Sequence, residues 1–135
     1  MDKNIQFIIV DTNFWLLFFE RAINILDGFE DLFLYKPFFI LVPSQVIREL
    51  ESFSKLKNKK ALAARSSLNL IDSLIKQKKA MVVKSPPHDT DKVILNLAKQ
   101  KKAIVATADL KLIKRLKAKK ILTITLKDKH LVRFV

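Results

Sequence analysis

FIIVDTNFWLL, residues 7–17, changes from apolar to polar and back to apolar within a few residues. The segment Ile5–Val10 is short, rich in β-branched residues and apolar on both faces, which predicts a buried parallel strand covered by helices. Asp11, Thr12 and Asn13 follow it directly. They have two interpretations: they cap the next helix, or they form part of a functional site at the end of the strand.

The composition indicates one domain with a substantial core and a polyanionic partner. The chain has 135 residues, of which 50% are hydrophobic, so we expect a single domain over residues 1–135. Its 26 Lys and Arg residues outnumber 13 Asp and Glu residues, leaving a net charge of +13. This favours nucleic acid, whose phosphates bind Lys and Arg with release of counterions. Lysine enrichment through genome bias or growth at high temperature is the alternative explanation.

Several classes of protein are excluded. The absence of cysteine rules out disulfides, thiolate zinc sites and a cysteine nucleophile. Gly28 is the single glycine, which rules out the glycine-rich phosphate loops of P-loop NTPases and dinucleotide-binding proteins. The N-terminus is unlike a signal peptide, and no apolar stretch approaches membrane-spanning length. We therefore expect a cytoplasmic protein without a membrane partner.

Strand-like segments alternate with helical patterns along the chain. Strands are predicted at Ile5–Val10, Phe38–Val42, Ala80–Val83, Ala103–Ala106 and Ile121–Thr125. Helices are predicted within Phe14–Leu34 (one or two, broken near Gly28), from Ser44, over Leu62–Ile75, from Thr90 as the cap, and over Leu110–Leu116. This alternation predicts a parallel α/β sheet between helices, and the tail Lys127–Val135 is a candidate edge strand.

Four carboxylates lie where this scheme places the ends of strands. Asp11 ends the first strand, Glu49 lies about one turn into the helix after the second, Asp91 begins the helix after the third, and Asp109 follows the fourth. The carboxyl ends of parallel strands share one edge of a sheet, so these side chains should gather there. Close carboxylates repel unless cations lie among them. Mg²⁺ and Mn²⁺ suit such oxygen ligands and can activate water against a phosphodiester.

Each of these acids also has a structural interpretation. Asp109 can serve only as a helix cap, and Asp91 can be a first-turn acid favoured by the helix dipole. Glu49 can form a surface pair with a lysine. Asp89 is the closest competitor of Asp91 as the third acid of the cluster.

Four ordered stretches carry a resemblance to the PIN-domain ribonucleases. They resemble most the stand-alone archaeal branch related to ribosomal-RNA processing nucleases. The stretches are VDTN (10–13), VPSQVIREL (42–50), DTDKVILNLA (89–98) and VATADLKL (105–112).

The resemblance implies both a fold and a site. The fold is α/β and PIN-like, with three layers and a parallel sheet of about five strands between helices. The site is a Mg²⁺ or Mn²⁺ centre with Asn13 and Thr107 orienting the first and last acids and Thr12 shaping the turn. Many relatives carry a second acid directly after the third one, where this chain has Lys92. The implied ligands are Asp11, Glu49, Asp91 and Asp109.

These observations predict a divalent-metal-dependent endoribonuclease that acts on single-stranded or locally unpaired RNA, in rRNA processing or RNA turnover with a ribosome-assembly partner. The alternatives are the toxin of a toxin–antitoxin pair, bound by its antitoxin, and a catalytically weak RNA-binding scaffold. Two lysine-rich runs are candidates for binding RNA phosphates, or else are solvated faces: Lys55, Lys57, Lys59 and Lys60, and Lys111, Lys114 and Arg115. The apolar residues Phe14, Trp15, Phe18 and Phe19 either pack in the core or form a homodimer surface.

Overall fold

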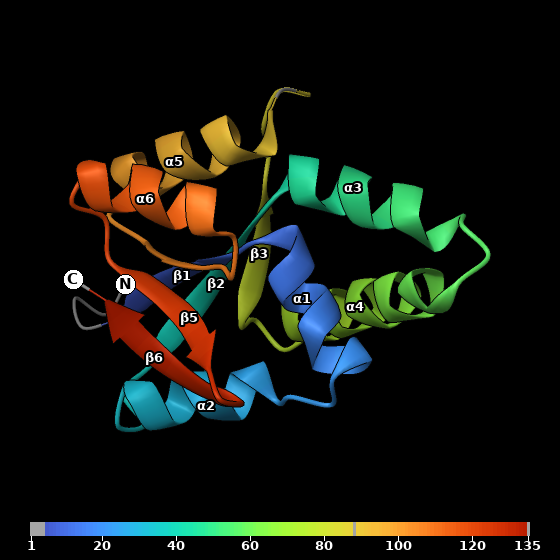
Figure 1. Cartoon of the computed structure of the whole chain (residues 1–135), viewed down its shortest axis with the longest axis horizontal. Helices are drawn as coiled ribbons and strands as arrows, with labels where there is room; N and C mark the ends of the chain where they lie inside the picture. The colour runs from blue at the N-terminus through green and yellow to red at the C-terminus, as the bar shows by residue number, and fades with distance from the viewer. Residues whose placement is uncertain (1–4, 88, 135) are drawn as a thin grey trace.

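A six-stranded sheet lies between helices in the computed structural model of the chain, which describes residues 5–87 and 89–134 (Figure 1). The strands are β1 Gln6–Val10, β2 Phe38–Pro43, β3 Ala80–Val83, β4 Ile104–Ala106, β5 Thr123–Lys127 and β6 His130–Phe134. The helices are α1 Thr12–Glu20, α2 Ile25–Leu32, α3 Ser44–Ser54, α4 Lys59–Lys76, α5 Thr90–Lys101 and α6 Leu110–Ala118. The predicted α/β fold with a mostly parallel sheet is confirmed.

The strand order is β3-β2-β1-β4-β5-β6, and all pairs are parallel except β5 with β6. β1 therefore lies in the interior of the sheet, with Ile8 opposite Ile40 on one side and Ile104 on the other. The tail forms β6, a sixth strand. Because β1 to β4 run parallel, the segments that follow them all leave the sheet at the same edge.

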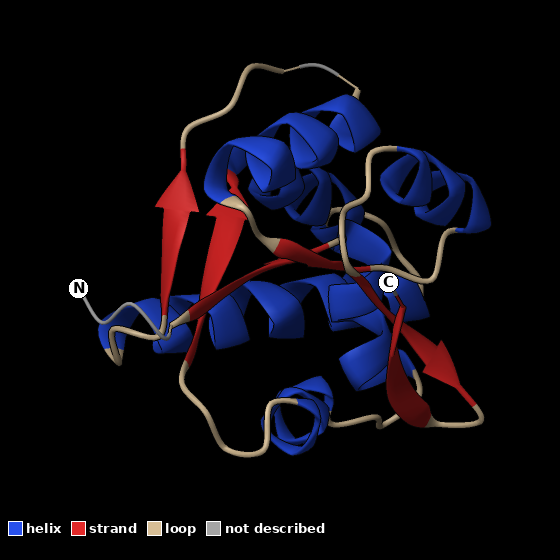
Figure 2. Ribbon diagram, turned by 90° about the vertical axis from the view of Figure 1, so that its left-hand side faces the viewer, coloured by secondary structure: helices blue, strands red, loops and turns tan. Residues whose placement is uncertain are grey.

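The two faces of the sheet are covered by different helices, as Figure 2 shows from the side. On one face, Ile9, Leu41 and Val105 pack in a cluster with apolar residues of α5 and α6. On the other face, Ile8 and Ile40 join a larger cluster with apolar residues of α1 to α4. Burying each such side chain contributes about 1.5–3 kcal/mol, so the sheet is held from both sides.

The helix break expected near Gly28 is wrong. α1 ends at Glu20, and α2 begins at Ile25, with Asn24 capping it by accepting a hydrogen bond from Asp27 N–H. Gly28 lies inside α2, where a β-carbon would collide with the side chain of Leu131 on β6. Glycine at this position therefore allows the close approach of α2 and the Leu131 side chain, rather than ending a helix, and a larger residue would require that side chain to shift.

The aromatic segment of α1 divides between core and surface. Phe14 and Trp15 are fully buried, which favours the core interpretation for these two residues. Phe18 and Phe19 are partly exposed and lie against each other, with ring centroids 4.7 Å apart. Within the described ranges, no helix combines the length and apolar character needed to cross a bilayer.

Candidate metal centre

Asp11 lies at the middle of the carboxyl edge of the sheet. It directly follows β1 and is the N-cap of α1, and its side chain is 6% exposed. Its Oδ1 accepts a hydrogen bond from Thr12 N–H at 2.8 Å, and its Oδ2 accepts one from the Thr107 hydroxyl at 2.8 Å. Capping and a confined carboxylate therefore coexist in one residue, so the two interpretations of Asp11 do not exclude each other.

Thr107 connects Asp11 with Asp109. The Thr107 side chain is fully buried just after β4, and its hydroxyl donates to Asp11 while accepting a hydrogen bond from Asp109 N–H at 3.1 Å. Asp109 is the N-cap of α6 and uses Oδ1 to accept from Lys111 N–H and Leu112 N–H. A single hydroxyl thus fixes the Asp11 carboxylate relative to the start of α6.

Thr12 connects Asp11 with Glu49 in a similar way. The Thr12 hydroxyl donates to Glu49 Oε1 at 2.7 Å, across 37 positions of sequence. Glu49 lies in α3, one and a half turns after its start, and is half-buried. The loop after β1 and the helix after β2 are therefore joined at the site by a short hydrogen bond to a carboxylate, which is stronger than a neutral one.

Asp91 lies in the first turn of α5 and has a cationic neighbour. Its Oδ2 is 3.8 Å from Arg115 Nη1 on α6. Asp89, the competing acid, is the N-cap of α5 and accepts from Asp91 N–H at 3.1 Å. Thr90, expected as the cap, is the first residue of the helix instead. The structure thus gives Asp89 the capping role and places Asp91 among the charges that act on Asp11.

Burial and mutual repulsion raise the pKa values of two of these acids. Burial is the largest cause that raises the pKa of Asp11 to about 6, with Asp91 and Glu49 adding to it against the hydrogen bonds from Thr107 and Thr12. The pKa of Asp91 is also raised, first by burial and then by Asp109 and Asp89, while Arg115 lowers it. Asp11 is therefore coupled to Asp91 and Glu49, and Asp91 is coupled to Asp109 and to the competing acid Asp89.

A polar network holds the loop before α5 against the start of α3. Arg48 donates to the Ser85 carbonyl at 2.9 Å and to Gln45 Oε1 at 3.0 Å, and the Ser44 hydroxyl accepts from Ser85 N–H at 2.8 Å. This network ties Ser85, in the segment after β3, to the helix that carries Glu49. These contacts were not predicted from the sequence, although an arginine in the second turn of a helix that begins directly after a strand was an available signal.

Other residues expected at the site lie differently. Asn13 is exposed, and its side chain makes no hydrogen bond to a described residue. The Asp11 carboxylate is held by the Thr107 hydroxyl and by Thr12 N–H instead of by Asn13. Lys60 has its Nζ 4.2 Å from the ring centroid of Phe53, a cation–π contact at the far end of α3. The other lysines of that run lie in the connection between α3 and α4 or at the start of α4, whereas the second run lies on α6, where Arg115 is beside Asp91. These lysines are Lys55, Lys57 and Lys59; the α6 residues are Lys111, Lys114 and Arg115.

The donor chemistry of the centre fits a hard divalent cation. All four acids offer carboxylate oxygens, which Mg²⁺ and Mn²⁺ prefer, and Asp11 makes no ion pair with a described cationic side chain. A cation beside it would offset the burial, and the smaller repulsion by Asp91 and Glu49, that raise its pKa. As they stand, no three His, Cys, Asp or Glu side chains in the described part of the chain are close enough to hold one ion. The oxygen donors of these residues thus suit a divalent cation. Ligation of one ion by three or more of them requires the carboxylates to move closer together.

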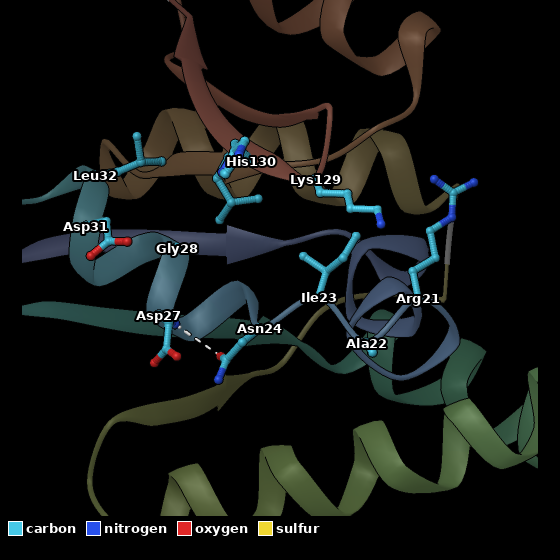
Figure 3. A pocket seen from close by; sticks show the side chains of 11 residues that line it. Arg21, Ala22, Ile23, Asn24, Asp27, Gly28, Asp31, Leu32, Lys129 and His130 are labelled. Atoms are coloured by element: carbon cyan, nitrogen blue, oxygen red, sulfur yellow. Dashed lines mark hydrogen bonds between the residues drawn. The ribbon is translucent and has the colours of Figure 1, made fainter.

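A large cavity, drawn in Figure 3, is lined by none of the four acids of the candidate centre. It measures about 620 Å³ and is bounded by the link between α1 and α2, by α2 itself and by the turn between β5 and β6. Arg21, Asp27, Asp31 and Lys129 give it mixed charge, so neither cations nor anions are clearly favoured.

Comparisons with known proteins agree on the architecture. A family model described as a PIN like domain matches residues 8–129. The solved structure of the PIN domain endonuclease Utp24 is similar with a TM-score of 0.71 at 22% identity, covering 93% of this chain and 88% of that one. A domain of a functionally unknown protein from Methanocaldococcus jannaschii DSM 2661 is similar with a TM-score of 0.65 at 19% identity, covering 90% and 91%. No curated protein matches the chain.

Proposed function

Because the chain belongs to the PIN-like domain family, whose members are generally nucleases, we propose that it is a divalent-metal-dependent endoribonuclease. The observation that carries the proposal is the confined Asp11 carboxylate, coupled to Glu49 and Asp91 and joined through Thr107 to Asp109. The net charge of +13 supports a nucleic-acid substrate. The activity of the structurally similar Utp24, an endonuclease, supports internal cleavage. We propose single-stranded or locally unpaired RNA as the substrate.

The side chains of the centre would divide the work. Asp11, Glu49, Asp91 and Asp109 would hold Mg²⁺ or Mn²⁺, which when bound supplies Lewis-acid stabilisation of charge on the phosphate oxygens. Thr107 orients the Asp11 carboxylate, and Thr12 orients that of Glu49.

Cationic side chains would hold the substrate beside these acids. Arg115 lies beside Asp91, where its guanidinium is placed to contact a phosphate. Water, rather than a side chain, is the nucleophile we propose.

A second candidate is a catalytically weak RNA-binding scaffold with the same fold. Two observations favour it: Lys92 follows Asp91 in the exposed first turn of α5, and the carboxylates are not already gathered around an ion position within the described ranges. Both candidates predict RNA binding, and only the first predicts cleavage that depends on metal.

The experiment compares Asp11→Asn with Asp72→Asn on a labelled single-stranded RNA in Mn²⁺, Mg²⁺ or chelator. Asp72 is the matched control because it is exposed on α4 and pairs only with Lys76 at 3.1 Å. We expect the parent and Asp72→Asn to cleave the RNA in Mn²⁺ or Mg²⁺ and not in chelator. The cleavage rate of Asp11→Asn should fall by more than the roughly 10–100-fold that is typical when a residue hydrogen-bonded to a metal ligand is removed. Its RNA affinity should be nearly unchanged. Metal-dependent cleavage at the parental rate by Asp11→Asn contradicts the proposal, and binding without cleavage by the parent assigns the scaffold.

A further inference from the structure

A second charged cavity lies at the opposite edge of the sheet from the carboxylates. It measures about 310 Å³ and opens between the C-terminal ends of α5 and α6. Four lysines line it, two from each helix end: Lys99, Lys102, Lys119 and Lys120. The remaining lining consists of apolar residues around the starts of β4 and β5, together with Gln6. The cavity is therefore a shallow apolar hollow with a basic rim.

The positive charge of this rim is not cancelled locally. No carboxylate lines the cavity, and none of the four lysines forms an ion pair with an acid in the described ranges. The ends of α5 and α6 each contribute about −0.5 charge from the helix dipole, which leaves a local excess of about +3. An anion of more than one charge is the ligand that this excess favours.

Backbone preference does not explain two of these lysines. Lys102 follows α5 with φ of 53°, and Lys120 follows α6 with φ of 58°, both in the left-handed region. Glycine is the residue best suited to that conformation at a helix C-terminus. A lysine in each place gives up backbone stability while adding charge to the cavity.

α5 and α6 connect this cavity with the carboxylate centre. Both helices begin at the centre, with Asp89 and Asp109 as their N-caps, and both end at the cavity (Figure 1). α5 has 12 residues and is about 18 Å long. Asp109 is the single acid between Lys92 and Lys120 in the sequence. Exposed basic side chains continue along α6, whereas α5 has none between Lys92 and Lys99; those on α6 are Lys111, Lys114, Arg115 and Lys117.

We propose that the cavity rimmed by Lys99, Lys102, Lys119 and Lys120 is a second phosphate-binding site, which holds the RNA backbone at the far ends of α5 and α6. The proposal rests on the proposed function for the identity of the polyanion as RNA. A strand bound at both sites would run along α5 and α6, so the contact lies outside the nucleotides next to the cleaved bond.

The test removes the two left-handed lysines and compares a matched pair elsewhere. Lys102→Gly with Lys120→Gly lowers the charge by two at the cavity. Lys78→Gly with Lys129→Gly lowers it equally at two other left-handed positions, with φ of 59° and 67°. RNA affinity is measured by fluorescence anisotropy with an unstructured 20-nucleotide RNA in chelator, so no cleavage occurs. We expect the cavity pair to weaken binding about tenfold more than the control pair.

The salt dependence gives a second readout of the same contacts. Loss of two phosphate contacts should make the log–log slope against KCl shallower by about 1.4 in the cavity pair. Both pairs should keep or slightly raise the parental melting temperature, because glycine suits the left-handed backbone at all four positions better than lysine does. Equal loss of RNA affinity in the two pairs overturns the proposal. A lower melting temperature of the cavity pair without a specific loss of RNA affinity also overturns it, because the lysines would then only stabilise the helix ends.

A small phosphate ligand is separated from RNA by adding tripolyphosphate. If it raises the melting temperature of the parent but not of the cavity pair, while RNA affinity is equal in both pairs, the cavity binds free phosphates and the RNA proposal is overturned. Because binding is measured without cleavage, loss of this proposal leaves the Asp11 test unaffected. Cleavage that survives Asp11→Asn likewise leaves a specific loss of affinity in the cavity pair standing.

Discussion

Asp11 combines a buried position with a charge that has no cationic partner in the described part of the chain. Its pKa in the folded protein, about 6, lies above the ordinary value of 3.8. A raised pKa of a carboxyl means that the folded state binds the proton more tightly than the unfolded state does. The stability due to protonated Asp11 is therefore complete below pH 3.8 and is lost as the pH rises through about 6.

We predict that Asp11→Asn stabilises the metal-free protein at neutral pH. The pKa shift of about 2 units corresponds to roughly 3 kcal/mol in the free energy of unfolding. Urea unfolding in chelator between pH 4 and pH 7.5 should give a difference between variant and parent that grows with pH and levels off above about pH 7. Asp72→Asn, at an exposed position, should give a nearly constant difference. A constant difference for Asp11→Asn would show that Asp11 is not held in the confined state described.

At this scale the sequence predicted which acids follow the strands but not how they are held. Asp11 and Asp109 were placed by reading strand ends, which needs only apolar runs and their direction. The Thr107 hydroxyl reaches Asp11 across 96 positions of sequence, and no periodicity indicates which hydroxyl turns toward which carboxylate. The resemblance implied that role for Asn13, yet its side chain lies exposed on the first turn of α1. Ligation by the four acids stays a prediction.

Among the elements, α2 shows where reading by residue type failed. Glycine commonly marks a helix end, so Gly28 suggested a break. The sequence also contained a better signal, since Asn24 with Asp27 three residues later is typical of a helix start. The sequence did not reveal that the side chain of Leu131, on β6, occupies the space beside Gly28. A contact between distant elements, rather than local helix preference, therefore accounts for a glycine at this position.

We predict that Gly28→Ala and Leu131→Ala are coupled in stability. Alanine in the middle of a helix is favoured over glycine by about 1 kcal/mol, but in the parent the new β-carbon meets the Leu131 side chain. Gly28→Ala should therefore fail to stabilise the parent and should gain about 1 kcal/mol in a Leu131→Ala background. A double-mutant cycle by urea unfolding measures this coupling. Equal effects of Gly28→Ala in both backgrounds would contradict the packing described for α2 and β6.

For the molecule as a whole, the alternation of strands and helices was sufficient to predict the α/β class, and the ordered motifs were sufficient to predict the family, which is confirmed. The order of strands in the sheet was not predicted. Apolar periodicity shows that a strand is buried but not which strands are its neighbours, and β1 lies between β2 and β4 because of pairing over about 100 residues. The sixth strand lay in the predicted tail, where short polar stretches weaken the pattern.

We predict that RNA binding by the whole protein depends steeply on salt. The charge of +13 is carried by lysines on several helices, so a bound strand should meet several of them. In chelator, the log–log slope of affinity against KCl should be steeper than about −3, equivalent to four or more phosphate contacts on a single strand. Asp11→Asn should give the same slope because it removes no cation. A slope shallower than about −1 would show that the basic surface serves another partner.

The interior position of β1 also sets an order of events during synthesis. Emergence of residues 1–83 provides β1, β2 and β3, whereas the hydroxyl that fixes Asp11 and the backbone that carries Asp109 belong to the segment after β4. Until that segment leaves the ribosome, one edge of β1 is unpaired and the carboxylates of the two halves are not joined. The site is therefore assembled only after the segment that follows β4 has left the ribosome, and any RNA-cleaving ability is acquired at that step rather than while β1, β2 and β3 alone have emerged.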